Sequence, residues 1–368
     1  MNDIIHGGDL VSAQSQYAIP VEDWLDLSTG INPVSYPVPR LNAELFQRLP
    51  YQSDQFKAAI NNYYGAEGLA CNGTQRVIEM LPALLPKLPV LLPECGYQEH
   101  RHSWAKRHNK ITYYPANDQS KAIETIEHQL ASGSPKHLLL INPNNPSGLS
   151  ISPEQVYRWA EQLQDGAYLI VDEAFVDLHP EHSVLDDYAY FRKLENLVVL
   201  RSFGKFFGLA GIRLGFVFSN NSLQKQLQSE FGPWSVNGPA QAIASAALND
   251  ASWQTSARNV IRLNAQATTK IWQPLFNKVA AKVLNGAGLF ITASLSVETA
   301  KHIYHFLAER GVLIRLVQVD EIRPQSSDFT KTEKAETCLL RSGLIDAQEE
   351  KQSQKMKQVI GELLLTLN

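Results

Sequence analysis

Cysteine is scarce in this sequence, and this scarcity argues against two kinds of stabilising site. The three cysteines, Cys71, Cys95 and Cys338, are scattered without Cys-x-x-Cys spacing. They therefore predict neither a disulfide framework nor a zinc site, and they suit a reducing compartment, the cytoplasm. A large excess of one charge is also lacking, because the chain has 33 Lys and Arg and 37 Asp and Glu, which gives a formal net charge of −4. We expect no general attraction to nucleic acid or acidic membranes, so an anionic small substrate must meet local positive charge.

Targeting and membrane segments are missing as well. The chain begins Met-Asn-Asp-Ile-Ile-His-Gly-Gly, without the basic run and apolar core that are typical of a secretory signal. Its apolar runs are interrupted well short of a membrane span, and it has no internal repeat or low-complexity tract. The apolar fraction of 44% and the charged fraction of 19% are typical of an ordinary soluble globular protein.

The length and the hydrophobic pattern predict two domains. A chain of 368 residues is longer than one core usually fills. From about residue 52 to 220, short apolar runs alternate with helical patterns, which predicts an α/β domain with a mostly parallel sheet covered by helices. The strands expected there are 89–93, 111–115, 137–141, 168–172, 197–201 and 213–218, and the helices are 54–64, 74–85, 153–163 and 222–231.

The chain from about residue 239 onward has a different order of elements, which suggests a smaller α+β domain. The expected elements are a long helical stretch to about Phe276, strands 282–284 and 289–292, helix 297–310, strands 312–315 and 337–341, and a helix from about Asp346. Between Leu316 and Glu336 the composition turns polar, which indicates a surface loop. We divide the chain into an N-terminal arm with part of the small domain (1–45), a large domain (46–245) and a small C-terminal domain (246–368).

Two segments carry groups suited to a phosphate. Asn72–Gln75 opens a predicted helix, where free backbone N–H groups bind phosphate well, although alone this segment could be an ordinary helix cap. Arg213 stands in the otherwise apolar segment Leu209–Gly215. A buried guanidinium needs an anion, and a phosphate suits its forked donors.

Two further segments place polar groups at the carboxyl ends of apolar strands, where α/β sheets bind ligands. Asn142–Gly148 directly follows one such strand, although Asn, Pro and Gly are also common in simple turns. Asp172 ends another strand. A carboxylate there is costly unless a cation faces it, and a pyridinium nitrogen would be such a partner. Helix capping is the alternative explanation for Asp172.

Lys205 is the candidate nucleophile. It lies in Arg201–Gly208, among aromatic and glycine residues beyond a further apolar strand. An amine in an apolar setting has a lowered pKa and can form a Schiff base. A lone lysine is usually a solvated surface charge, but the strand and the flanking residues favour a chemical role here.

These motifs together make the chain resemble the fold-type I pyridoxal-phosphate enzymes. Their order is Asn-Gly-Thr, Asn-Asn-Pro-Ser-Gly, Asp-Glu-Ala-Phe, Ser-Phe-Gly-Lys and Gly-Ile-Arg-Leu-Gly. The nearest branch is that of the histidinol-phosphate aminotransferases, and within it the chain is most similar to the threonine-phosphate decarboxylases of cobalamin biosynthesis. The resemblance covers essentially the whole chain. The segments that favour this branch are His6–Gly8, Leu27–Pro33, Tyr97–His100, Ser202–Lys205 and Pro233–Asn237.

The resemblance implies a role for each matching position. Lys205 would hold pyridoxal 5'-phosphate covalently, and Asp172 would pair with the pyridine nitrogen so that the ring works as an electron sink. Asn145 would bond the ring's phenolic oxygen, and Tyr97 would stack on the ring. The residues implied at the cofactor phosphate are Gly73, Thr74, Ser202 and Arg213. Those implied at the substrate are His6 and Asn32 in an N-terminal arm, Arg315 near a side-chain phosphate and Arg341 at the α-carboxylate.

Three positions depart from the family pattern. Phe175 stands where many relatives have a tyrosine whose hydroxyl reaches the ring oxygen. Gly204 replaces a frequent Ser or Thr before the lysine, which removes one phosphate donor. The family forms homodimers, and Tyr51 is the candidate to reach the neighbouring subunit's cofactor phosphate in place of the usual Tyr-Pro pair.

The activity that the resemblance implies is decarboxylation of L-threonine O-3-phosphate to (R)-1-amino-2-propanol O-2-phosphate and CO2. The motifs also fit a histidinol-phosphate-type aminotransferase, since one scaffold serves many chemistries. A cofactor-binding regulator without catalysis is a third hypothesis, against which the joint presence of Lys205, Asp172, Asn145 and Arg213 argues.

Two histidines in and just after the Tyr97 segment do not predict a metal site. His100 and His102 flank Arg101 on a predicted helix, and residues at i and i+2 do not face each other. We therefore expect no metal site and assign His100 no role.

Overall fold

The computed structural model describes residues 6–284, 286–318 and 337–367, so residues 319–336 of the expected polar loop lie outside the described residues. The chain divides into two compact units. The large unit consists of Ser35–Asn145 and Leu149–Ser256, and the small unit of Met1–Val34, Pro146–Gly148 and Ala257–Asn368. No helix in the described part of the chain combines the length and the apolar character needed to cross a bilayer.

The large unit contains, within the described residues, a seven-stranded sheet with the order β2-β8-β7-β6-β5-β3-β4. Its strands are β2 (Leu69–Cys71), β3 (Val90–Pro93), β4 (Ile111–Tyr114), β5 (His137–Ile141), β6 (Leu169–Asp172), β7 (Leu197–Ser202) and β8 (Gly215–Phe218). Neighbouring strands are parallel except where β8 pairs with β7 and with β2. The mostly parallel sheet is confirmed, and β2 is a strand that the sequence analysis missed.

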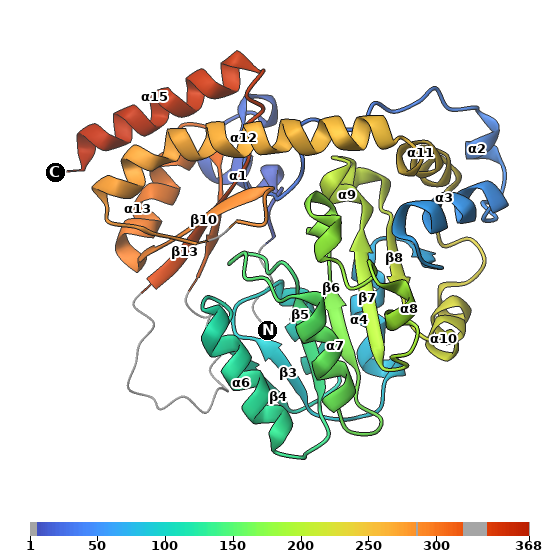
Figure 1. Ribbon diagram of the computed structural model, residues 1–368. Coiled ribbons are helices and arrows are strands. Elements are labelled where there is room, and N and C mark those ends of the chain that lie inside the picture. Colours follow the sequence, from blue (N-terminus) through green and yellow to red (C-terminus); the bar gives the residue numbers. More distant parts are fainter. Residues whose placement is uncertain (1–5, 285, 319–336, 368) are drawn as a thin grey trace. The chain divides into compact units, whose positions relative to one another are not determined.

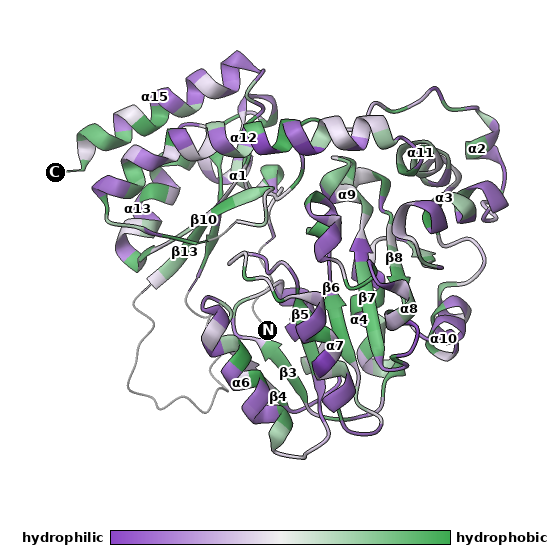
Figure 2. Ribbon diagram, in the orientation of Figure 1, coloured by the Kyte–Doolittle hydropathy of each residue, from purple (hydrophilic) through white to green (hydrophobic). Residues whose placement is uncertain are grey.

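Helices cover this sheet because its strands are apolar on both faces. β5 and β6 are buried along their whole lengths, as parallel strands usually are, and Figure 2 shows the central strands as hydrophobic over most of their lengths. One face packs against α4, α5 and α10, and Figure 1 shows α7 in front of the sheet and α4 behind it. The α-helices that lie wholly within the large unit are α2 (Glu44–Gln47), α3 (Asp54–Tyr64), α4 (Thr74–Leu84), α5 (Gln98–Lys106), α6 (Gln119–Ala131), α7 (Pro153–Gln162), α8 (Tyr188–Phe191), α9 (Phe203–Phe206), α10 (Asn221–Phe231) and α11 (Gly238–Leu248) in the described residues.

The bounds of α3 show why local sequence signals predicted it well. The Ser53 hydroxyl accepts a hydrogen bond from the Phe56 N–H at 3.2 Å, which caps the first turn. The helix ends at Gly65, which adopts a left-handed conformation with φ of 65°. A helix C-terminus of this kind favours glycine because no Cβ opposes positive φ.

The small unit is built around an antiparallel sheet of order β12-β13-β10-β9. The strands are β9 (Lys282–Leu284), β10 (Phe290–Ser296), β12 (Arg315–Val317) and β13 (Thr337–Gly343), and a separate parallel pair joins β1 (Leu25–Asp26) to β11 (Val312–Leu313). The helices of this unit are α1 (Leu10–Tyr17), α13 (Val297–Ala308) and α15 (Glu350–Thr366), and α12 (Ala251–Lys278) begins in the large unit and continues here. The apolar faces of α12, α13 and α15 share one core with the sheet, whereas α1 packs in a separate cluster with Trp24, Ala308 and Leu313.

Two expected elements of the small unit differ from the structure. The single strand expected at 312–315 is two short strands, because β11 pairs with β1 whereas β12 pairs with β13. The last helix begins at Glu350 and not near Asp346, because Asp346 forms a turn. Its carboxylate accepts from the Gln348 N–H, and its own N–H donates to the Gln352 side chain.

Candidate active site

The carboxyl ends of three parallel strands of the large unit define the candidate site. In the β5–β6 register Ile141 pairs with Asp172, and in the β6–β7 register Asp172 pairs with Leu200. The chain therefore leaves all three strands at the same edge of the sheet. A pocket of about 710 Å³ lies there. Its lining residues are Gly73, Thr74, Gln75, Tyr97, Ile141, Asn145, Asp172, Ala174, Phe175, Ser202, Gly204, Lys205, Ala210, Arg213 and Leu214.

All eight residues that the sequence suggested for a cofactor line this one pocket. They are Gly73, Thr74, Tyr97, Asn145, Asp172, Ser202, Lys205 and Arg213. Six separate segments of the chain supply them, and the strand order of the sheet brings those segments together. In the described part of the chain, no cluster of three or more His, Cys, Asp or Glu side chains could hold a metal ion.

One end of the pocket is shaped for an anion. Gly73 caps α4 with φ of 77°, and a Cβ at this position would lie 2.9 Å from the Arg213 Nη2 atom. A Cβ on Gly215 would lie 2.7 Å from the Thr74 backbone nitrogen. Gly73 thus allows the guanidinium to approach the start of α4 closely, and Gly215 allows the start of β8 to approach it. Backbone N–H groups at a helix start together with an arginine suit a phosphate.

Arg213 corrects one expectation from the sequence. We expected a buried guanidinium, but Arg213 is exposed at the pocket. The reason is that β8 begins only at Gly215, and Arg213 follows the short 3-10 helix η4 (Ala210–Ile212) in a left-handed conformation with φ of 57°. Such a conformation is uncommon for a residue with a side chain and tends to occur at functional sites.

The centre of the pocket holds a buried carboxylate. Asp172 is 4% exposed. Its Oδ1 atom accepts from the Ala174 N–H at 3.1 Å, and its Oδ2 atom lies 2.9 Å from His100 Nε2. The two oxygens are therefore each held by a separate partner, which fixes the plane of the carboxylate.

His100 is the residue that the sequence analysis missed. It is buried on α5, three positions after Tyr97, and pairs with Asp172. The spacing holds the signal that could have found it, because residues at i and i+3 lie on one face of a helix.

The Lys205 amine lies near an aromatic side chain of the pocket. Lys205 is half-buried on α9, and its Nζ atom lies 5.9 Å from the centre of the Phe175 ring. The Tyr97 hydroxyl donates to Gln75 Oε1 at 3.0 Å, which fixes the phenol ring. Gly204 is explained by a close approach, since a Cβ there would lie 2.5 Å from the Ala210 Cα atom. The loop that carries Asn145 is closed by paired hydrogen bonds between Asn142 and Ile151.

The four residues suggested for the substrate all belong to the small unit. Arg315 and Arg341 face each other directly across β12 and β13, and Arg341 donates to the Ser28 carbonyl oxygen. Burial, together with the neighbouring Arg315, lowers the pKa of Arg341 to about 10, which leaves it charged at neutral pH. Asn32 is buried and accepts from the Val34 N–H at 3.0 Å, whereas His6 is exposed.

Like charges directly opposite on adjacent strands are destabilising. A bound anion would offset this repulsion between Arg315 and Arg341, so the pair is a candidate anion site. Gly7 of the N-terminal motif lies close to the Ser28 carbonyl oxygen that accepts from Arg341, because a Cβ on Gly7 would lie 2.2 Å from this oxygen.

Comparison with known proteins places the chain in a family. The model of the aminotransferase class I and II family matches residues 26–328. The chain belongs to this family. It is 36% identical to the threonine-phosphate decarboxylase of Pseudomonas aeruginosa, over 84% of this chain and 88% of that one. It is 34% identical to the threonine-phosphate decarboxylase of a Sinorhizobium species, over 78% and 83% of the two chains. A solved family fold, the histidinol-phosphate aminotransferase of Clostridium acetobutylicum, superposes with a TM-score of 0.75 at 21% identity, covering 93% of this chain and 100% of that one.

The close approach at Gly73 generates a prediction. Gly73→Ala should weaken binding of pyridoxal phosphate, the cofactor that the sequence resemblance implies, by about tenfold or more, which corresponds to about 1.4 kcal/mol. The new Cβ displaces Arg213 and also opposes positive φ, which costs roughly 1–2 kcal/mol in a residue other than glycine. An absorbance titration of the purified protein measures the dissociation constant.

Gly133→Ala is the matched control. Gly133 has a similar φ of 69°, but a Cβ there has no neighbour within 4 Å. It should lose stability without losing affinity. Equal affinities in the two variants would contradict the role of Gly73 in placing Arg213.

Proposed function

We propose that this chain catalyses the pyridoxal-phosphate-dependent decarboxylation of L-threonine O-3-phosphate to (R)-1-amino-2-propanol O-2-phosphate and CO2, a step of cobalamin biosynthesis. The observation that carries the proposal is the convergence of an amine, a buried carboxylate and an anion-binding end in one pocket of the large unit. The two relatives named threonine-phosphate decarboxylase support the choice of reaction, since they match most of the chain.

The pocket has the groups that pyridoxal phosphate would need. The start of α4 and Arg213 would hold its phosphate, together with Ser202. Lys205 would bind its aldehyde, and Asp172 would face its pyridine nitrogen. Asn145 and Tyr97 would contact the ring. The clearance that Gly73 and Gly215 leave around Arg213 and Thr74 is a property of the chain itself that fits a phosphate. When bound, the cofactor draws electrons from the bond broken at the substrate's Cα.

The chain's own residues would prepare and complete the reaction. His100 and the Ala174 N–H keep the Asp172 carboxylate in one orientation, so that it can hold a proton on the ring nitrogen. Burial raises the pKa of the Tyr97 phenol, which therefore stays neutral. Lys205 Nζ would return a proton to the substrate Cα after CO2 has left.

The substrate's two anionic groups match the two arginines of the small unit. A decarboxylase must orient the substrate's carboxylate for cleavage, whereas an aminotransferase must orient the Cα–H bond. Arg341 would bind the carboxylate and Arg315 the phosphate, both with charge-assisted hydrogen bonds. His6 and Asn32 would cover the substrate from the N-terminal segment.

The first prediction under this proposal concerns the reaction. The purified enzyme with pyridoxal phosphate should release CO2 from L-threonine phosphate in the absence of any keto acid. The release is measured by trapping labelled CO2 from substrate that carries the label in its carboxylate. Addition of 2-oxoglutarate should not change the rate of this release. Formation of glutamate from 2-oxoglutarate without CO2 would contradict the proposal and favour a histidinol-phosphate-type aminotransferase, which the family match also fits.

The second prediction concerns Arg341. Replacing it with Ala should lower kcat/KM on the order of 100-fold, because the substrate carboxylate loses its charge-assisted hydrogen bonds. Lys should rescue little, since it lacks the planar fork. Arg310, which forms a partly exposed pair with Glu362, provides the control. Arg310→Ala should leave kcat/KM unchanged, and an equal loss in the two Ala variants would indicate a purely structural role for Arg341.

We also propose a homodimer, as the resemblance implies. Two segments of the large unit expose large apolar side chains. The segments touch through the Tyr51 and Trp234 rings, which meet edge to face with 6.3 Å between their centres. Exposed apolar patches of this kind often mark protein interfaces. The exposed members of this patch are Val38, Phe46, Leu49, Tyr51 and Trp234. Tyr51 is the proposed contributor to the partner's cofactor site.

The dimer proposal predicts the effect of a charge in the patch. Phe46→Glu should shift the protein toward monomer in sedimentation velocity at micromolar concentration, because the interface would have to desolvate a carboxylate. Leu365→Glu, at an 85% exposed position of the small unit, should leave the distribution unchanged. A wild-type protein that sediments as a monomer would refute the proposal.

The cytoplasm is the compartment that we propose. Cys71, Cys95 and Cys338 are all buried, and none of them forms a disulfide. Free thiols persist in a reducing compartment.

A further inference from the structure

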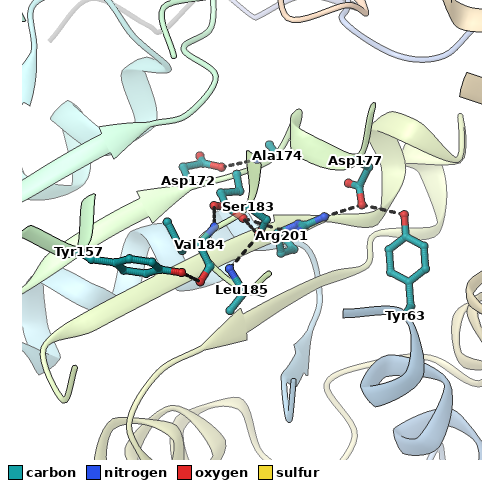
Figure 3. A network of polar contacts seen from close by, with 10 residues as sticks. Tyr63, Tyr157, Asp172, Ala174, Asp177, Ser183, Val184, Leu185 and Arg201 are labelled. Atoms are coloured by element: carbon teal, nitrogen blue, oxygen red, sulfur yellow. Dashed lines mark hydrogen bonds and ion pairs between the residues drawn. The ribbon is translucent and has the colours of Figure 1, made fainter. Parts of the chain in front are cut away.

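A buried charge cluster lies directly beside the pocket in the large unit, and the mechanism above does not use it. Arg201 Nη2 lies 2.6 Å from Asp177 Oδ1, and Arg201 Nη1 lies 3.4 Å from Glu173 Oε2 (Figure 3). The Ser183 hydroxyl donates to Glu173 at 2.6 Å and accepts from Arg201 at 3.1 Å. The Tyr63 hydroxyl donates to Asp177 at 2.9 Å.

This cluster is costly. Arg201, Glu173 and Asp177 are 3%, 0% and 2% exposed. Burial raises the pKa of Glu173 despite the neighbouring arginine. For Arg201, burial opposes the charge, but Asp177 and Glu173 more than offset it and raise the pKa. Buried ion pairs of this kind often stabilise a fold no more than apolar side chains of the same size would. Fold stability alone therefore gives little reason for three charged groups here.

The positions of the two carboxylates suggest a different role. Glu173 and Asp177 bracket Ala174 and Phe175, and one guanidinium binds both ends of this segment. Between those ends, the Ala174 N–H holds Asp172 and the Phe175 ring faces Lys205.

Arg201 itself is placed on the strand that carries the amine. It is the next-to-last residue of β7, directly before Ser202 and four residues before Lys205. The backbone N–H of Glu173 donates to the Leu200 carbonyl oxygen at 2.8 Å, so the two strand ends are joined there as well. The guanidinium also lies over the Tyr64 ring of α3, 4.8 Å from its centre.

We propose that Arg201 is a positioning residue that clamps the segment Glu173–Asp177 to the end of β7, and thereby sets the orientation of Asp172 and Phe175 relative to Lys205. A guanidinium can do this because its donors form a rigid fork, whereas apolar contacts have no direction. Binding groups must be held to within about 0.5 Å to be effective. The proposal rests on the proposed function, since the ligand so positioned is pyridoxal phosphate.

The test separates positioning from stability. Arg201→Lys keeps the charge but can serve only one carboxylate well. The triple variant R201M/E173Q/D177N removes every charge of the cluster, so it leaves no buried ion uncompensated. Tyr157→Phe is the control, because its hydroxyl donates to the Val184 carbonyl oxygen at 2.7 Å beside the cluster without contacting Arg201. Each protein is assayed for its melting temperature, its dissociation constant for pyridoxal phosphate and the absorbance spectrum of the bound cofactor across pH.

The clamp predicts that cofactor binding and stability respond separately. Arg201→Lys and the triple variant should bind pyridoxal phosphate about tenfold or more weakly and shift the pH midpoint of the cofactor's absorbance. The triple variant should do so at a melting temperature near that of the wild type. Tyr157→Phe should melt lower with an unchanged affinity and spectrum.

Wild-type affinity and spectrum in the triple variant would overturn the proposal, since the charges would then serve the fold alone. If neither variant folds, Asp177→Asn is tested by the same measurements. Its amide keeps the size of the aspartate side chain and one hydrogen-bond acceptor. A wild-type protein that does not bind pyridoxal phosphate would refute the proposed function and the clamp with it. Wild-type binding that every variant retains would refute only the clamp.

Discussion

The register of three parallel strands is the constraint on which the candidate site depends. Ile141, Asp172 and Leu200 are neighbours across β5, β6 and β7, so every chain segment that leaves these strands begins at one edge. The hydrogen-bond ladders that fix this register are buried, and a slip of one residue would turn each side chain to the other face. Asn145, Asp172 and Lys205 meet only because that register holds.

Close backbone approach completes what the strands begin. Gly73, Gly204 and Gly215 each stand where a Cβ would collide with a neighbouring backbone or with Arg213. Arg213 itself adopts a left-handed conformation. Uncommon conformations of this kind persist where the surrounding structure determines them, and they concentrate at binding sites. The pocket therefore combines a regular scaffold with local strain at its anion-binding end.

The sequence predicted the parts of this arrangement that depend on local pattern. Apolar runs predicted the central strands and helical patterns predicted α3, and the motifs identified eight of the residues that line the pocket. Contacts between distant segments carry no such periodic signal. Three features depend on which elements become neighbours. They are the pairing of His100 with Asp172, the ion cluster at Arg201 and the division of 312–315 into two strands. The exposure of Arg213 was missed for a related reason, because an apolar segment predicted a strand where the chain turns.

If the pocket holds pyridoxal phosphate through Lys205, reduction with borohydride should fix the cofactor covalently on that residue. The protein is incubated with pyridoxal phosphate, reduced with borohydride, digested and mapped by mass spectrometry. We expect one dominant cofactor adduct, on the peptide that contains Lys205, and its loss in Lys205→Ala. A dominant adduct on any other lysine, or none at saturating cofactor, would contradict it.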